Sequence, residues 1–274
     1  MAPKDPRLVE ALIEEAEQAL DEDDLLRAEA LAERAVALGP HNPAAWLLKG
    51  DLLVSRGDRE SAAGAYRRAA LAAPELGPGW AALALCLFEL LRVDEASVAC
   101  SRALRSDPSC AEAWWVRSLI REWRGDASGA ARARIHAHSL DPEEHPYHHD
   151  LHDDEVDRLV SEALLELPPP VRDALAEIAI VVEPMPDEAT CRSYDPPMSP
   201  LDLLGCFHGA SLMERSLHDP WSQIPGEITL YKGNLSRLAN DRQELLDQLR
   251  ITLLHEIGHF LGLDEDDLED RGLD

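Results

Sequence analysis

The chain has 274 residues, and its 26 lysines and arginines against 53 aspartates and glutamates give a formal net charge of −27. Because so acidic a surface repels phosphate backbones and anionic lipid headgroups, we expect neither a nucleic acid nor a membrane as its partner. The five cysteines form no CxxC pair, and no apolar run is long enough for a signal or transmembrane segment, so we expect a cytoplasmic protein without disulfides.

The first half of the chain contains a repeat of 34 residues. This interval separates four prolines, three tryptophans and two series of alanines: Pro40, Pro74, Pro108 and Pro142; Trp46, Trp80 and Trp114; Ala28, Ala62, Ala96 and Ala130; Ala35, Ala69, Ala103 and Ala137. Each unit has the pattern of two amphipathic helices, because the proline closes the second helix and the alanines allow close helix packing. The pattern predicts an α-solenoid of about four helical hairpins over residues 1–142.

The spacing and residue types of these units resemble tetratricopeptide repeats, which are helical hairpins stacked side by side. The resemblance covers residues 7–142, and the first unit departs from the pattern because Leu12 replaces the tryptophan. It implies a concave surface that binds a protein partner or a peptide. The alternative is that the array is a spacer or an oligomerisation surface.

The segment from Glu143 to Asp157 is polar and interrupts the pattern. It contains four histidines among acidic residues: His145, His148, His149 and His152. Such a tract can bind a metal, but we favour a solvated linker, because ligands on a flexible backbone are poorly positioned. A second domain is therefore predicted over residues 143–274.

Helices and strands alternate in this second half. Helical periodicity spans residues 156–164 and resumes over 171–177 after three prolines. The apolar, β-branched run at 178–182 predicts a buried strand, and residues 226–231 alternate like a strand with one exposed face. Residues 243–263 read as one long helix. Together these elements predict a small α+β domain.

The long helix contains the sequence His255-Glu256-Ile257-Gly258-His259. Because the two histidines are four residues apart, both imidazoles project from one helical face and can share a tetrahedral metal ion, Zn²⁺. Glu256 is placed to reach a water on the metal rather than the metal itself, which is the HExxH pattern of zinc peptidases. We favour this interpretation over two hydrogen-bonded core histidines, because the full pattern has the spacing of a ligand pair.

A third ligand is expected in the acidic segment that follows. Gly262 can turn the chain back, and Glu265, ten residues after the first histidine, is our candidate to supply a carboxylate oxygen. The alternatives are two adjacent aspartates and two upstream histidines: Asp264, Asp266, His208 and His218.

With two further segments, Leu203–Gly209 and Ile224–Tyr231, the HExxH block resembles the minimal-zincin family of bacterial metallopeptidases. The resemblance covers residues 153–271, although family members carry aspartate at the position of Glu265. It implies a zinc-dependent peptidase that hydrolyses peptide bonds with a metal-activated water and with Glu256 as general base.

The same resemblance suggests how the substrate is held. Residues 226–231, as an upper edge strand, would pair with an extended peptide, so the predicted substrate-binding residues are Ile228, Thr229, Leu230 and Tyr231. The repeats would recruit the substrate or a partner. Residues 143–274 have a net charge of −21, against −6 for residues 1–142, which favours basic peptides.

Two alternatives to an active peptidase remain open. In the first, the protein is a non-catalytic binding scaffold whose zinc site is structural or silent. In the second, the domain is latent because the histidine-rich junction or the acidic tail blocks the site.

Overall fold

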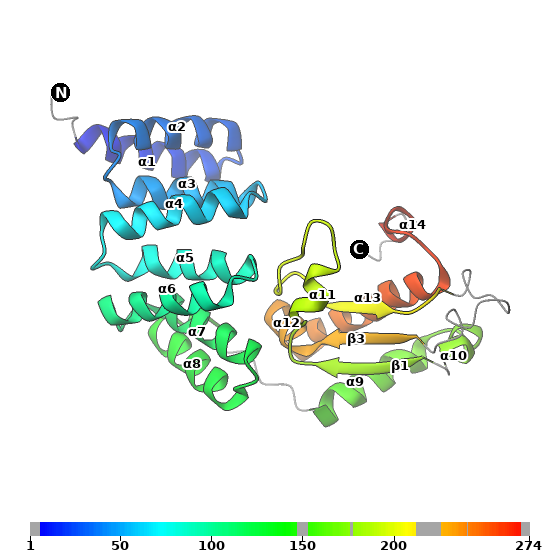
Figure 1. Cartoon of the computed structure of the whole chain (residues 1–274). Coiled ribbons are helices and arrows are strands. Elements are labelled where there is room, and N and C mark those ends of the chain that lie inside the picture. The colour runs from blue at the N-terminus through cyan, green and yellow to red at the C-terminus, as the bar shows by residue number, and fades with distance from the viewer. Residues whose placement is uncertain (1–5, 147–152, 176–177, 212–225, 240, 270–274) are drawn as a thin grey trace. The chain divides into compact units, whose positions relative to one another are not determined.

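The computed structural model describes residues 6–146, 153–175, 178–211, 226–239 and 241–269 (Figure 1). The chain divides into two compact units, unit 1 (residues 1–147) and unit 2 (residues 148–274). No helix within the described ranges is long and apolar enough to cross a membrane.

Unit 1 is built from helices that pair in consecutive hairpins, and successive hairpins stack (Figure 1). Its helices are α1 (Pro6–Asp21), α2 (Leu25–Leu38), α3 (Pro43–Ser55), α4 (Arg59–Ala72), α5 (Gly77–Glu89), α6 (Val93–Ser106), α7 (Ala111–Trp123) and α8 (Ala127–Leu140). The predicted α-solenoid is therefore confirmed.

The repeated tryptophans and prolines form one hydrogen bond in each of the second, third and fourth hairpins. The indole N–H groups of Trp46, Trp80 and Trp114 donate to the carbonyl oxygens of the prolines six residues earlier, at 2.9, 3.2 and 2.9 Å. This bond ties the start of each hairpin to the turn before it, so the two residue types must recur together. The repeated alanines are buried, as close helix packing requires.

The turns inside the hairpins also repeat. Asp23, Gly57, Leu91 and Gly125 all have positive φ, at one position of each unit. The aspartate that follows caps the next helix in three of the units, because its side chain accepts a backbone N–H of that helix. Three of these four turns are thus stabilised by a side-chain cap from the residue that follows the positive-φ position.

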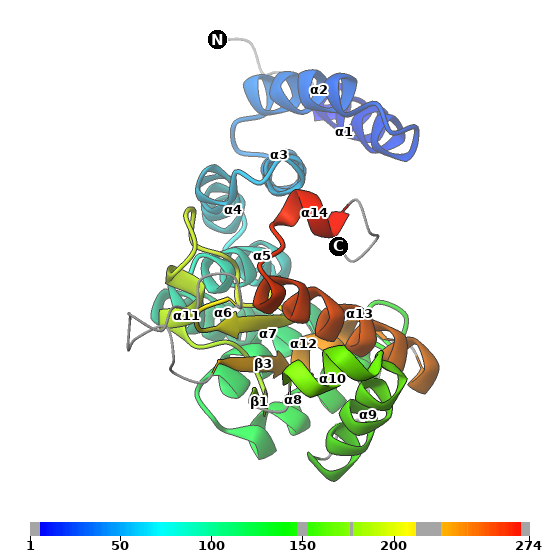
Figure 2. The same cartoon turned by 90° about the vertical axis from the view of Figure 1, so that its right-hand side faces the viewer.

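Unit 2 packs helices on a small sheet. Its elements are α9 (Asp153–Glu166), α10 (Pro169–Leu175), β1 (Ala179–Glu183), α11 (Glu188–Arg192), β2 (Gly205–His208), β3 (Glu227–Tyr231), α12 (Lys232–Leu238), α13 (Arg242–Leu261) and α14 (Glu265–Glu269). Helices α9 and α13 cover one face of the sheet (Figure 2). Ile228 and Leu230 of β3 join Leu249 and Leu253 of α13 in the core there. The expected α+β fold is confirmed.

The expectation that residues 226–231 form an edge strand is wrong. In the described part of unit 2 the strand order is β1-β3-β2, with β3 parallel to β1 and antiparallel to β2. The four residues expected to bind substrate, Ile228, Thr229, Leu230 and Tyr231, are at most 4% exposed. The reason is that β2 pairs with the side of β3 that we expected to be free. β2 is too short for its alternation of polar and apolar residues to be recognised in the sequence.

The segment expected to be a solvated linker begins later than predicted. The His145 ring stacks on Trp115, with ring centroids 5.8 Å apart, and its Nε2 lies 3.4 Å from Oε2 of Glu112. The first residues after α8 therefore pack on the repeats. The other three histidines of this segment, His148, His149 and His152, lie outside the described residues.

Candidate metal centre on helix α13

Helix α13 is a rigid support for the HExxH residues. Asp241 caps its first turn by accepting hydrogen bonds from the backbone N–H groups of Gln243 and Glu244. Its apolar face is buried along the whole length, from Leu245 to Phe260. Burial on one side fixes the rotation of the helix, and therefore the direction in which both histidines point.

The two imidazoles converge on one point. Nε2 of His255 and Nε2 of His259 are 3.0 Å apart, within hydrogen-bond distance of each other, and the two ring planes are nearly perpendicular, at 84°. Zinc–nitrogen bonds of about 2.0–2.1 Å in tetrahedral geometry place two ligand nitrogens about 3.3 Å apart. The pair therefore fits a shared zinc ion with only a small outward movement of the rings.

The turn after α13 orients the second histidine. Gly262 has φ of +92°, and the N–H groups of Gly262 and Leu263 donate to the carbonyls of His259 and Gly258, each at 3.0 Å. This Schellman motif brings the carbonyl oxygen of Leu263 to 3.2 Å from Nδ1 of His259. Because a carbonyl can only accept, this contact favours the tautomer with the proton on Nδ1, which directs the lone pair of Nε2 towards His255 and the position that a shared metal would take.

Glu256 of α13 faces β2, which is an outer strand of the sheet within the residues that the structure describes. Its side chain is buried, at 6% exposure. A Cβ added at Gly205 of β2 would come within 2.8 Å of Thr252 Cγ2 and 3.1 Å of Glu256 Oε1. Gly205 therefore makes room for the carboxylate. Gly205 is the first residue of β2, and a glycine in a strand marks a close approach of another element, but this short strand was not recognised in the sequence.

No group of three or more His, Cys, Asp and Glu side chains among the described residues is arranged to hold a metal ion. Glu265, the candidate third ligand, is not covered by this finding, because its side chain is not among those that the structure describes. Its backbone begins α14. Helix α14 docks on the motif, because Leu268 covers the space where a Cβ of Gly258 would be.

The structure describes three of the four alternative ligands. Asp264 caps α14 by accepting the N–H of Asp267 at 2.9 Å, and Asp266 is exposed. Phe207 packs on Phe260 of α13, with ring centroids 5.8 Å apart, so the alternation of β2 directs His208 away from α13. His218 lies outside the described residues.

Comparisons with known proteins find a family match in each of the two units. Residues 175–273 match the zincin-like metallopeptidase family, and residues 13–79 match a tetratricopeptide repeat family. The chain thus contains tetratricopeptide repeats followed by a zincin-like metallopeptidase domain. No curated protein matches the sequence.

Several solved structures resemble unit 1. YrrB, a TPR protein with an unusual peptide-binding site, is 18% identical, with a TM-score of 0.40 over 47% of this chain and 66% of that chain. A thermophilic TPR protein of Thermus thermophilus is 19% identical, with a TM-score of 0.44 over 48% of this chain and 74% of that chain. A mutant O-GlcNAc transferase of Thermobaculum terrenum is 22% identical, with a TM-score of 0.45 over 51% of this chain and 27% of that chain.

Proposed function

We propose that unit 2 is a zinc-dependent peptidase domain and that the repeats of unit 1 recruit its peptide substrate or a protein partner. The observation that carries the first part is the 3.0 Å separation of the two Nε2 atoms beside a buried glutamate. The match to the zincin-like family supports the assignment of zinc. The repeat family supports the second part.

In this proposal His255 and His259 hold the zinc ion, and Glu265 completes the protein ligands. Glu265 begins the helix that Leu268 docks against Gly258, which keeps its backbone beside the HExxH turn. A glutamate has one more methylene than aspartate, and therefore a longer reach from that backbone position. Zinc, when bound, is a Lewis acid that polarises the scissile carbonyl and activates water.

The other functional groups belong to the chain itself. Glu256 is the general base, and its carboxylate takes a proton from the attacking water and returns it to the leaving amine. The substrate pairs with the outer edge of β2, since Gly205 of this strand lies against Glu256 and β3 is enclosed by its two neighbours.

All five cysteines are free and buried. This supports the proposal that the protein works in a reducing compartment such as the cytoplasm.

The test is metal-dependent peptide hydrolysis by the full chain. We expect hydrolysis that stops on chelation and returns with one equivalent of zinc, and we expect His259→Ala to lose both zinc and activity. Asp173→Asn, which removes an exposed carboxylate of α10, is the matched control and should behave as wild type. A chain that binds zinc tightly but cleaves no peptide would instead be a scaffold with a structural site.

A further inference from the structure

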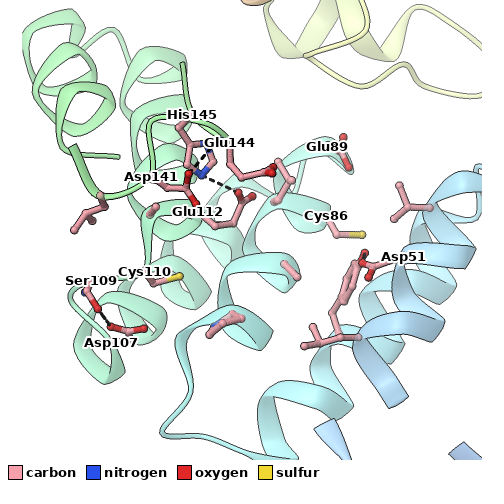
Figure 3. A pocket seen from close by; sticks show the side chains of 18 residues that line it. Asp51, Cys86, Glu89, Asp107, Ser109, Cys110, Glu112, Asp141, Glu144 and His145 are labelled. Atoms are coloured by element: carbon pink, nitrogen blue, oxygen red, sulfur yellow. Dashed lines mark hydrogen bonds and ion pairs between the residues drawn. The ribbon is translucent and has the colours of Figure 1, made fainter. Parts of the chain in front are cut away.

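Unit 1 contains a cavity of about 600 Å³ lined by side chains of successive hairpins (Figure 3). Its walls come from α3, α4, α5, the turn between α6 and α7, α7, and the end of α8 with the segment that follows it. It therefore extends across three hairpins, as a site for an elongated ligand would. Its volume lies within the range of small-ligand pockets, about 300–1,000 Å³.

The charged groups of this cavity are nearly all acidic. Among the described residues, six carboxylates and one histidine line it, and no lysine or arginine does: Asp51, Glu89, Asp107, Glu112, Asp141, Glu144 and His145. Outside the cavity lining, residues 1–142 hold 17 lysines and arginines against 18 aspartates and glutamates. The acidic excess of the repeats is thus concentrated in the cavity.

Some of these carboxylates are compensated by neighbours. Glu89 pairs with Arg59 at 3.5 Å, and Asp107 accepts hydrogen bonds from Ser109. Asp51, by contrast, accepts a hydrogen bond from a neutral group, the hydroxyl of Tyr66, at 2.7 Å. Burial raises the pKa of Asp51.

Glu112, Glu144 and His145 lie close together at the other end of the cavity, away from Asp51 (Figure 3). Burial raises the pKa of Glu112 to about 7, and repulsion from Glu144 and Glu89 adds to it. Its neighbour His145 offers little compensation, because burial lowers the pKa of that ring. Negative charge in this cavity is therefore costly until a cation enters.

We propose that the cavity binds lysine or arginine side chains of an extended peptide, so that the repeats recruit basic substrates or partners. The carboxylates match the cationic head groups, while apolar residues of the wall such as Leu47, Pro78 and Leu85 contact the aliphatic stems. The peptide backbone follows the line of hairpins. The recruiting role rests on the proposed function, but the binding itself needs neither zinc nor Glu256.

Fluorescence anisotropy of a labelled peptide tests this directly. The probe is a peptide of about nine residues in which lysine alternates with alanine, a length that spans successive hairpins. The matched probe has glutamine at each lysine position. The protein is the full chain with Glu256→Gln, which prevents hydrolysis during the titration. We expect the lysine peptide to bind at least about tenfold more tightly, with an advantage that shrinks at high salt.

A pair of variants locates the site. Glu112→Gln keeps the shape of the side chain and removes its charge, and we expect it to weaken the lysine peptide about threefold to tenfold. Glu14→Gln makes the same change on the exposed surface of α1 and should have no effect. If Glu112→Gln fails to fold, Asp51→Asn at the other end of the cavity gives the same comparison.

Equal affinity for the two peptides would overturn the proposal. So would a loss no larger in Glu112→Gln than in Glu14→Gln, because the peptide would then bind the acidic unit 2 instead. A failure of the peptidase function would leave these affinities unchanged, so the two proposals fail separately.

Discussion

Glu112 should reduce the stability of the repeats at neutral and alkaline pH. The pKa of its carboxyl is 4.5 in a model compound and about 7 in the folded chain, mainly because of burial. An acid with a raised folded pKa binds more protons folded than unfolded. Its stabilising effect is therefore complete below about pH 4.5 and is lost as the pH rises through about 7.

The size of the effect follows from the two pKa values. A difference of about 2.5 corresponds to about 3 kcal/mol at 1.36 kcal/mol per pKa unit. Because the side chain is 38% exposed, solvent screening reduces this to about 1–2 kcal/mol. The glutamine in Glu112→Gln cannot ionise. We therefore expect the free energy of unfolding of the variant to exceed that of wild type by about 1–2 kcal/mol at about pH 8.5, and by less than half of that at about pH 5.5.

Urea unfolding followed by tryptophan fluorescence measures this difference. Five of the six tryptophans lie within residues 1–142, so the signal reports mainly on the repeats. The lower pH of about 5.5 is chosen to stay above the isoelectric point of about 4.6, because a chain without net charge tends to precipitate. Glu14→Gln is the control and should show no pH-dependent difference. A Glu112→Gln gain of equal size at both pH values, or a loss at about pH 8.5, would refute the electrostatic explanation.

Three further predictions concern unit 2. Gly205→Ala places a methyl group against Thr252 and Glu256. In thermal unfolding we expect a loss of about 1–3 kcal/mol of stability, and peptide hydrolysis should fall more than zinc affinity. Unchanged hydrolysis would show that β2 can move away from α13. Gly262→Ala puts a side chain on a residue with φ of +92° and therefore strains the backbone. We expect a loss of about 1 kcal/mol of stability and weaker zinc binding, measured by competition with a chromophoric chelator. Zinc affinity equal to that of wild type would mean that the turn does not orient His259. Glu265→Gln should weaken zinc by at least about tenfold in the same assay, with Asp266→Asn as its control; the reverse order would make Asp266 the ligand.

Features with a local cause were predictable from the sequence. The 34-residue repeat is readable because each tryptophan bonds a proline six residues earlier in its own chain segment. The histidine pair is readable because its spacing alone places both rings on one helical face. Both patterns depend on residues close in sequence.

Features that depend on distant residues were missed. β2 is four residues long, so its alternation gave no signal, and the position of β3 in the sheet was misjudged as a result. The acidic cavity gathers Asp51 of α3, Glu89 of α5 and Glu112 of α7 from three separate hairpins. No period links these residues, and only the stacking of the helices brings them together.

The central claim is that Glu256 performs proton transfer beside a zinc ion held by other residues. The most direct measurement compares peptide hydrolysis by wild type and Glu256→Gln at equal zinc content, determined by metal analysis of the assayed samples. We predict that the variant retains one zinc per chain and loses hydrolysis by at least about a hundredfold. Full hydrolysis by the zinc-loaded variant would contradict the role of Glu256 as general base.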